Sequence, residues 1–167
     1  MNQSDSTKRL GRWFDAHAAG LVLYARQWLD PAAAEDVVQE VFLKLLAQPI
    51  EPRNEKAWLF TAVRNAAIGA QRSMHRRVHR ERTSGGDRAW FESRAEDLID
   101  AAAAQVALSD LPADQREIVV LRIWGDLTLA EASEVLAEPV STLFSRYKTG
   151  LAAIRRRMES SCKTKTI

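Results

Sequence analysis

Nearly the whole chain repeats its apolar residues at intervals of three and four, and no segment alternates apolar with polar residues as a half-buried strand would. Each segment thus has the pattern of an amphipathic helix. Of the 167 residues, 46% are hydrophobic and 28% are charged, so the chain has enough apolar surface to fold. The sequence predicts an all-α protein with one large or two small domains.

The first half of the chain predicts three helices joined by short loops. The first helix is expected from about Lys8 to Leu29. Asp30 can cap the second helix, with Pro31 in its first turn, and Asn54 can cap the third. The apolar residues expected to face inward are Val37, Val38, Val41, Phe42, Leu45 and Leu46 on the second helix and Trp58, Leu59, Ala62, Val63, Ala66 and Ile68 on the third. Three such helices can bury a core, so residues 1–79 are predicted to form a first domain.

Residues 80–94 have no clean helical period, and Gly85 and Gly86 mark a flexible joint, so this segment is predicted to be a linker. Residues 95–167 are predicted to form a second domain, with helices at about 95–109, 113–124, 128–136 and 140–158. The last of these helices is expected to turn Leu143, Tyr147, Leu151, Ile154 and Met158 to one side and polar and basic residues to the other. A helix, a short turn and a second helix with such an outer face is the signature of a helix-turn-helix that enters the major groove of DNA. Helical hairpins without a role in DNA binding are also common, so the pattern alone leaves both interpretations open.

The charges gather in blocks along the chain, although 24 Lys and Arg nearly balance 22 Asp and Glu. Acidic residues dominate residues 30–51 and 95–138, and basic residues dominate 64–82 and 146–165. Two separated basic blocks suit a protein that grips a polyanion at two places, because neutralising phosphates supplies most non-specific affinity for nucleic acid. Two solvated helix faces would give the same pattern.

Several classes of protein receive no support from the sequence. The single cysteine, Cys162, excludes a disulfide framework within the chain and a cysteine-based zinc site, and it favours a reducing compartment such as the cytoplasm. No stretch approaches the roughly 20 apolar residues that span a bilayer. His75 and His79 have a spacing that could share a metal, but their surroundings are cationic and lack a suitably placed glutamate. No phosphate loop, nucleophile elbow or paired carboxylates stand out, so we expect no enzyme, no catalytic residues, no metal and no cofactor.

Three segments, in this order along the chain, resemble those of a bacterial RNA polymerase sigma factor of the extracytoplasmic-function (ECF) group. Residues 34–43, AEDVVQEVFL, resemble the family's segment for binding core polymerase. Residues 57–65, AWLFTAVRN, resemble the segment that engages the −10 promoter element, and residues 111–122, LPADQREIVVLR, resemble the opening of the domain for the −35 element. The helix-turn-helix would then run from Leu127 to Arg146.

The resemblance implies three sets of site residues. The set for core polymerase is Asp36, Gln39 and Glu40, whose acidic and amide groups would pair with a basic surface. The set for the −10 element is Arg64, Asn65, Arg72, Arg76, Arg77 and Arg80, in which asparagine can bind an exposed base edge and the arginines can follow the phosphates. The set for the −35 element is Ser141, Thr142, Ser145, Arg146 and Lys148. Trp58 could stack on a flipped base, but an inward aromatic is more often part of a core, so Trp58 is left out of these sets.

The chain departs from the usual family pattern at several positions of the helix-turn-helix. Ala137 stands where glycine is usual, Glu138 where an apolar residue is common, and Ser133 where alanine is common. Phe144 stands where lysine or arginine is frequent, which changes the expected base preference. Gly69, where aspartate is usual, could make the end of the third helix less rigid.

The expected function is that of a sigma factor, which binds core polymerase, directs it to specific promoters and helps to open the duplex. The family also implies an anti-sigma factor or another signal partner that masks these faces. The alternative is a helix-turn-helix transcription regulator that binds DNA without core polymerase. In that case the face formed by Asp36, Gln39 and Glu40 would have no binding partner.

Overall fold

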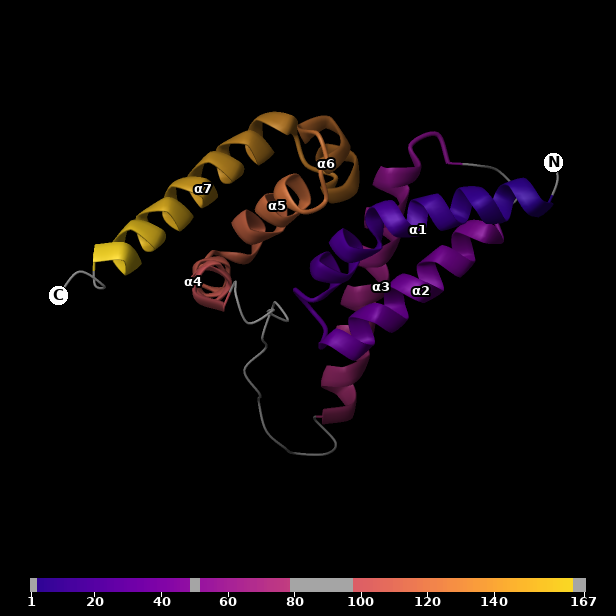
Figure 1. Cartoon of the computed structure of the whole chain (residues 1–167), viewed down its shortest axis with the longest axis horizontal. Helices are drawn as coiled ribbons and strands as arrows, with labels where there is room; N and C mark the ends of the chain where they lie inside the picture. Colours follow the sequence, from indigo (N-terminus) through magenta and orange to yellow (C-terminus); the bar gives the residue numbers. More distant parts are fainter. Residues whose placement is uncertain (1–2, 49–51, 79–97, 164–167) are drawn as a thin grey trace. The chain divides into compact units, whose positions relative to one another are not determined.

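The computed structural model describes residues 3–48, 52–78 and 98–163, and all seven elements found there are α-helices (Figure 1). This confirms the predicted all-α class for the described part of the chain. The protein divides into two compact units. Helices α1–α3 belong to the first unit, and α4, α5, the start of α6 and α7 belong to the second. The predicted linker, residues 80–94, lies outside the described residues.

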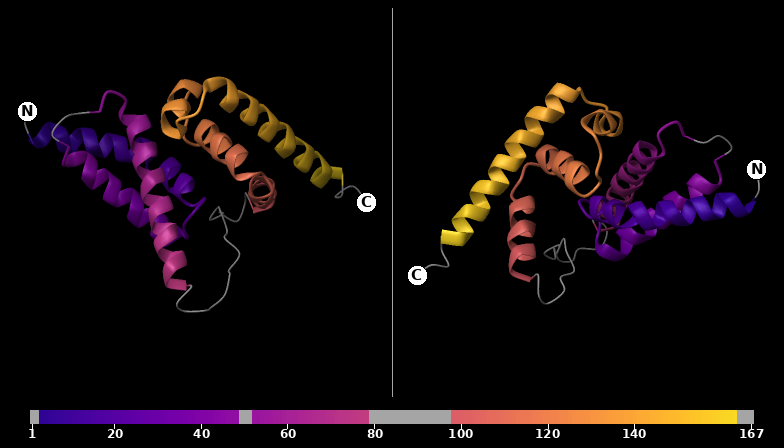
Figure 2. Two further views of the ribbon diagram at one scale, coloured as in Figure 1. Left: turned by 180° about the vertical axis from the view of Figure 1, so that it is seen from behind. Right: turned by 45° about the horizontal axis from the view of Figure 1, so that its top comes forward.

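The first unit consists of α1 (Gln3–Ala25), α2 (Pro31–Leu46) and α3 (Glu55–Val78), and each of these helices packs against the other two. Figure 2 shows α3 crossing α1 and α2. An aromatic cluster occupies the core. The fully buried ring of Tyr24 lies edge-on to Phe60 at 5.5 Å and to Trp28 at 5.2 Å between ring centroids. Aromatic pairs in this geometry add to the free energy of burying the rings.

The predicted starts of the second and third helices are confirmed. The Asp30 carboxylate accepts a hydrogen bond from the backbone N–H of Ala33 at 3.0 Å, and Pro31 occupies the first helical turn. The Asn54 side-chain oxygen accepts from the N–H of Ala57 at 3.1 Å. These oxygens satisfy N–H groups that have no partner inside the helix.

The predicted bounds of the first helix, about Lys8 to Leu29, are wrong at both ends, because α1 begins at Gln3 and ends at Ala25. The next residues form a tighter turn, in which the N–H groups of Gln27 and Trp28 bond three residues back. Asp30 needs an extended backbone to cap α2, so the chain must leave the helix before it. Leu29 is still buried, which explains why its apolar character fitted the helical pattern.

The inward faces of α2 and α3 differ partly from the prediction. Leu46 is 46% exposed, although it was expected inside. On α3 the buried residues are Ala57, Leu59, Phe60, Val63 and Ala67, whereas Trp58, Ala62, Ala66 and Ile68 are half-buried. The apolar surface of α3 is therefore wider than the stripe that α1 and α2 cover.

The second unit contains α4 (Leu98–Ser109), α5 (Ala113–Ile123), the start of α6 (Leu129–Leu136) and α7 (Val140–Lys163). Helix α7 packs against both α5 and α4 (Figures 1 and 2). The buried apolar residues here include Ile118, Leu121, Leu127 and Leu143. A Cβ atom at Gly150 would lie 3.0 Å from Val119 Cγ2, so glycine at this position permits the close approach of α5 and α7.

The helices of this unit agree with the expected ones in number and order. Thr128 is the N-cap of α6 and forms a reciprocal capping box with Glu131. Helix α7 continues to Lys163, beyond the expected end at Met158, and Met158 is 40% exposed rather than inward. The expected start of α4 at residue 95 lies outside the described residues.

Two arginines of α5 join the loops of this unit to its helices. The Arg116 guanidinium donates hydrogen bonds to the carbonyl oxygens of Leu108, Ser109 and Leu111 at 2.9–3.0 Å. These carbonyls lie where α4 ends and thus lack partners within the helix. Burial lowers the pKa of Arg116. Arg122 donates to the Leu127 carbonyl and lies over the Tyr147 ring at 5.6 Å, so it ties α5 to both the next loop and α7.

Candidate functional sites

The outer face of α2 carries the three residues predicted to bind core polymerase. Asp36, Gln39 and Glu40 are all exposed, and Val37 and Val38 on the other side of the helix are buried. Leu43, one turn further along, is 64% exposed. Positions 36, 39, 40 and 43 share one helix face. The face therefore combines carboxylates, an amide and a leucine that the first unit itself does not cover.

The residues predicted for the −10 element lie along α3. Asn65 is exposed and Arg64 is half-buried. Arg72, Arg76 and Arg77 are exposed on the later turns, and the helix continues through Gly69 to Val78. Arginines near a helix C-terminus also suit the helix dipole, so their position alone does not assign them a ligand. Arg80 lies outside the described residues.

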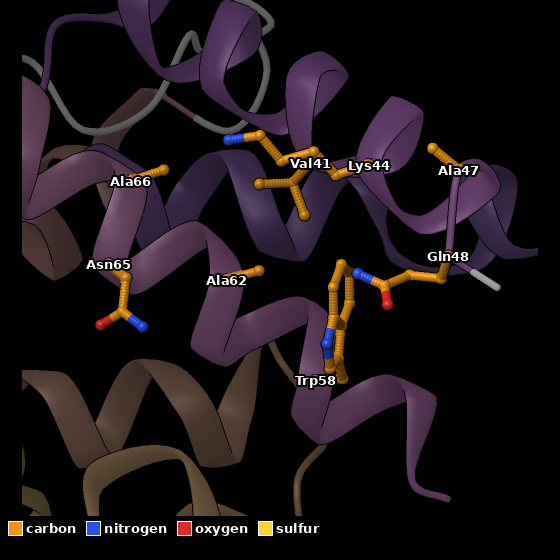
Figure 3. A pocket seen from close by; sticks show the side chains of 8 residues that line it. All are labelled: Val41, Lys44, Ala47, Gln48, Trp58, Ala62, Asn65 and Ala66. Atoms are coloured by element: carbon orange, nitrogen blue, oxygen red, sulfur yellow. The ribbon is translucent and has the colours of Figure 1, made fainter. Parts of the chain in front are cut away.

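A surface pocket of about 450 Å³ lies between α2 and α3 (Figure 3). Its lining residues are Val41, Lys44, Ala47, Gln48, Trp58, Ala62, Asn65 and Ala66. The row from α3 supplies an aromatic ring, two alanines and an amide. Lys44 near the end of α2 supplies an ammonium group, and Gln48, which follows α2, supplies a second amide. A pocket lined by an aromatic ring, small apolar groups and amides can receive a planar, hydrogen-bonding group such as a base.

The sequence prediction of Trp58 as a core residue is therefore only partly right, because the side chain is half-buried and lines this pocket. The signal that could have shown this was the width of the apolar surface on α3. Trp58, Ala62 and Ala66 follow one another at four-residue spacing. They lie beside the buried row rather than within it.

The helix-turn-helix predicted at Leu127–Arg146 consists of α6, a short turn and the start of α7. Four of the five residues predicted for the −35 element are on the accessible side of α7. Ser141, Ser145 and Lys148 are exposed, and Thr142 is half-buried.

Arg146, the fifth predicted residue, is held by two carboxylates of its own unit. Its Nε lies 3.1 Å from Asp114 Oδ2, and its Nη1 lies 3.0 Å from Glu138 Oε1. The side chain is 28% exposed. The guanidinium thus joins the start of α5, the turn and α7. Contact with a base would require it to give up or share these partners.

Three residues that depart from the family pattern meet in this turn. Ala137 ends α6 in the left-handed region, with φ of 54°, where glycine is normally preferred. The Ser133 hydroxyl donates to the Glu138 carbonyl oxygen at 2.6 Å, and the Glu138 carboxylate accepts from Arg146. Ser133, Glu138, Arg146 and Asp114 form one connected set, called here the turn network. It holds a turn that has no glycine to relax its backbone.

Phe144 is 50% exposed at the start of α7, between Ser141 and Lys148 on the helix surface. The Lys148 ammonium nitrogen lies 5.5 Å from the centroid of its ring. This distance allows a cation–π interaction, which orients both groups.

Within the described ranges, no group of three or more His, Cys, Asp or Glu side chains could hold a metal ion. His75 is exposed, and His79 lies outside those ranges. No helix in the described part of the chain is long and apolar enough to cross a membrane.

Two family models match the chain in the order of its two units. The model for Sigma-70 region 2 matches residues 13–78, which covers α2, α3 and most of α1. The model for Sigma-70 region 4 matches residues 101–154, which includes the helix-turn-helix. The fold and the two matched regions define a sigma factor of the Sigma-70 class.

Known relatives narrow this class further. The ECF RNA polymerase sigma factor SigL of Mycobacterium tuberculosis is 32% identical over 149 residues, which cover 85% of this chain and 84% of that protein. SigK of Mycobacterium ulcerans, another ECF sigma factor, is 28% identical over 83% of this chain and 79% of its own. This chain belongs to the ECF group of RNA polymerase sigma factors.

Solved structures share the fold. The sigma factor RpoE of Bartonella quintana, crystallised with the anti-sigma factor NepR, superposes with a TM-score of 0.75 at 24% identity, over 91% of this chain and 98% of its own. CnrH in complex with the cytosolic domain of CnrY gives a TM-score of 0.65 at 23% identity, over 92% of this chain and 90% of its own. At these identities the likeness bears on the fold alone.

Proposed function

We propose that this sigma factor binds core polymerase through the outer face of α2 and contacts the promoter through α3 and α7. It directs the polymerase to specific promoters and helps to open the duplex. The observation that carries the proposal is the face formed by Asp36, Gln39, Glu40 and Leu43, whose four side chains are all exposed and belong to the matched region 2. The chemistry of transcription belongs to the polymerase, and this chain acts without enzymatic activity of its own.

The chemistry of the α2 face suits a basic partner surface with an apolar centre. Carboxylates form strong, directional hydrogen bonds with arginine and lysine, and they steer a partner of opposite charge into register. Leu43, at 64% exposure, would supply apolar area at the same contact.

The pocket between α2 and α3 is the proposed receptor for an unstacked base of the −10 element. Trp58 offers a ring for stacking, and Asn65 offers both a donor and an acceptor. The exposed Arg72, Arg76 and Arg77 on later turns of α3 would hold phosphates. Capture of a base outside the duplex would favour the open state of the promoter.

The start of α7 is the proposed contact for the −35 element. Ser141, Ser145 and Lys148 are accessible, and Thr142 lies beside them. Arg146 is bound in the turn network, so we assign its main role to positioning α7 rather than to binding a base. The cytoplasm, where polymerase and chromosome are found, is the proposed location. An anti-sigma factor or another signal partner that masks these faces is the proposed regulator.

The experiment is promoter-dependent transcription by purified core polymerase, with and without this protein, on DNA from upstream of its own operon. Wild type should form a complex with core polymerase and start transcripts at a defined position. Asp36→Lys with Glu40→Lys should weaken the complex by about tenfold or more, because like charges in an interface cost several kcal/mol. Asp15→Lys, an exposed acid on α1, is the matched control and should leave binding unchanged.

A second arm tests the pocket. Ala62→Phe places a ring in the pocket between α2 and α3 and should impair promoter opening while preserving binding to core polymerase. Opening is measured by the reactivity of unpaired thymines. Unchanged opening would exclude the pocket as a base receptor, and failure of the wild type to bind core polymerase would instead favour the alternative of a regulator acting alone.

A further inference from the structure

The exposed face at the start of α7 contains an apolar stripe. Val140 is 44% exposed and Phe144, one turn later, is 50% exposed. Lys148 follows after another turn on the same face, with its ammonium group over the Phe144 ring. Ser141 and Ser145 flank the stripe and are exposed as well. A recognition helix thus presents a phenyl ring at the middle of its accessible face.

The charges around this stripe favour DNA over a protein as its partner. Between Glu138 and Glu159 the chain has five cationic residues and no acidic ones. Two of them, Arg155 and Arg156, extend the positive charge along the exposed surface of the same helix, whereas Arg157 forms an ion pair with Asp110. A polyanion is the partner that such a surface attracts.

The turn network removes the one arginine of the helix-turn-helix that could bind guanine. The Nε and Nη1 groups of Arg146 form ion pairs with Asp114 and Glu138. What remains on the accessible face is a phenyl ring, two serine hydroxyls and the Lys148 ammonium group. Among the base pairs, the major groove displays one apolar group, the 5-methyl group of thymine.

We propose that Phe144 contacts the 5-methyl group of a thymine in the −35 element and is a determinant of this sigma factor's promoter preference. The inference rests on the proposed function of α7. A phenyl ring cannot form the hydrogen bonds that distinguish guanine or adenine, but it gains by covering a methyl group. Lys148 holds one face of the ring through a cation–π contact and keeps an ammonium group beside it for a phosphate or a guanine oxygen.

The size of the effect follows from the methyl group itself. Loss of one methyl group from an apolar contact corresponds to about a fourfold loss of affinity. Because deoxyuridine differs from thymidine only by this group, a thymine-to-uracil exchange isolates the contact without changing hydrogen bonds.

The experiment uses the full chain assembled with core polymerase. A duplex library randomised over the upstream element is first selected by the wild-type holoenzyme. In the selected duplex, each thymine is then replaced in turn by deoxyuridine, and affinity is measured for wild type, Phe144→Ala and Phe144→Leu. Met158→Ala, which removes another exposed apolar side chain of α7, is the matched control.

If the proposal is correct, replacing thymine by deoxyuridine at one or two positions lowers the affinity of the wild type and of Met158→Ala about fourfold. The same replacements leave the affinity of Phe144→Ala unchanged, and they lower the affinity of Phe144→Leu by a smaller factor. Equal affinity of the wild type for thymine and uracil at every position would overturn it. So would a Phe144→Ala variant, helical by circular dichroism, that still distinguishes the two bases. If the wild-type holoenzyme selects no duplex at all, the proposed function fails, and that result is separate from loss of the methyl effect.

Discussion

The two units of this sigma factor are stabilised by different means. In the first unit, three long helices bury an aromatic cluster around Tyr24 and Phe60. The second unit combines three short helices with the long α7 and also buries apolar residues. Its helices and loops are joined in addition by arginine side chains, with Arg116 at the end of α4, Arg122 at the loop before α6, and Arg146 in the turn network.

This difference indicates how precisely each unit must hold its helices and loops in position. Apolar burial is not directional, so it holds helices together and tolerates small changes in their orientation. Hydrogen bonds and ion pairs depend on distance and angle, so they fix the path of loops. A short turn connects α6 to α7, and the arginines therefore act where a small error in the backbone path would displace the whole of α7.

The largest expected loss of stability comes from disrupting the aromatic cluster of the first unit. Phe60→Ala should destabilise the first unit by about 3–5 kcal/mol, because it removes a fully buried ring from the cluster with Tyr24. Hydrogen exchange of α1–α3 during urea titration would measure the loss. Phe14→Ala removes a ring that is 43% exposed and should cost far less. Equal losses would show that the cluster has no special weight.

The second prediction concerns the hydrogen bonds that Arg116 donates in the second unit. Arg116→Leu keeps an apolar stem but removes the donors to three carbonyl oxygens, and it should destabilise the second unit by about 2–3 kcal/mol. Chemical unfolding followed by exchange in α4 and α5 would measure it. Arg157→Leu breaks an exposed ion pair with Asp110 and should cost at most about 1 kcal/mol. If Arg116→Leu left the stability of the second unit unchanged, the comparison would be refuted for this unit.

The turn network should show a smaller coupling. A double-mutant cycle of Arg146→Ala and Glu138→Ala should give a coupling energy of about 1 kcal/mol that decreases as salt increases, because the pair is partly exposed. The same variants separate the two roles of Arg146. If it positions α7, Glu138→Ala should weaken promoter binding nearly as much as Arg146→Ala, and polymerase binding should be unaffected. A binding loss confined to Arg146→Ala would restore its direct contact with DNA.

The smallest expected effect is a gain in stability rather than a loss. Ala137 has φ of 54°, which costs a non-glycine residue roughly 1–2 kcal/mol. Ala137→Gly should therefore stabilise the second unit, by about 0.5–1 kcal/mol after the greater freedom of glycine in the unfolded chain is subtracted. Thermal unfolding would detect the gain. Thr128→Ala, which removes the N-cap of the same helix, is the control and should destabilise by about 1 kcal/mol.

The fold could be predicted to a large extent because its signals are local. The caps at Asp30 and Asn54 depend on a side chain and the N–H group three residues later. The helix-turn-helix was recognisable from helical period and turn length. The end of α1 was misplaced because Leu29 continues the apolar pattern after the helix has ended.

The site was less predictable, since it depends on which apolar and charged groups find partners. Trp58 carries the same signal as a core residue, and only the placement of α2 beside α3 leaves it lining a pocket. Arg146 was expected to face DNA, but Asp114, which lies 32 positions earlier in the sequence, and Glu138 both reach its guanidinium. No periodicity within α7 could reveal these partners.

The sequence by itself determined the all-helical class, the order of the helices and the acidic face of α2, because each follows from contacts between residues a few positions apart. The tertiary structure decided which exposed groups are available for a partner. Packing of α3 against its neighbours left an apolar strip uncovered, and convergence of α5, the turn and α7 bound one arginine while leaving Phe144 accessible. Burial and long-range pairing are properties of the assembled helices, and for that reason they decide the sites.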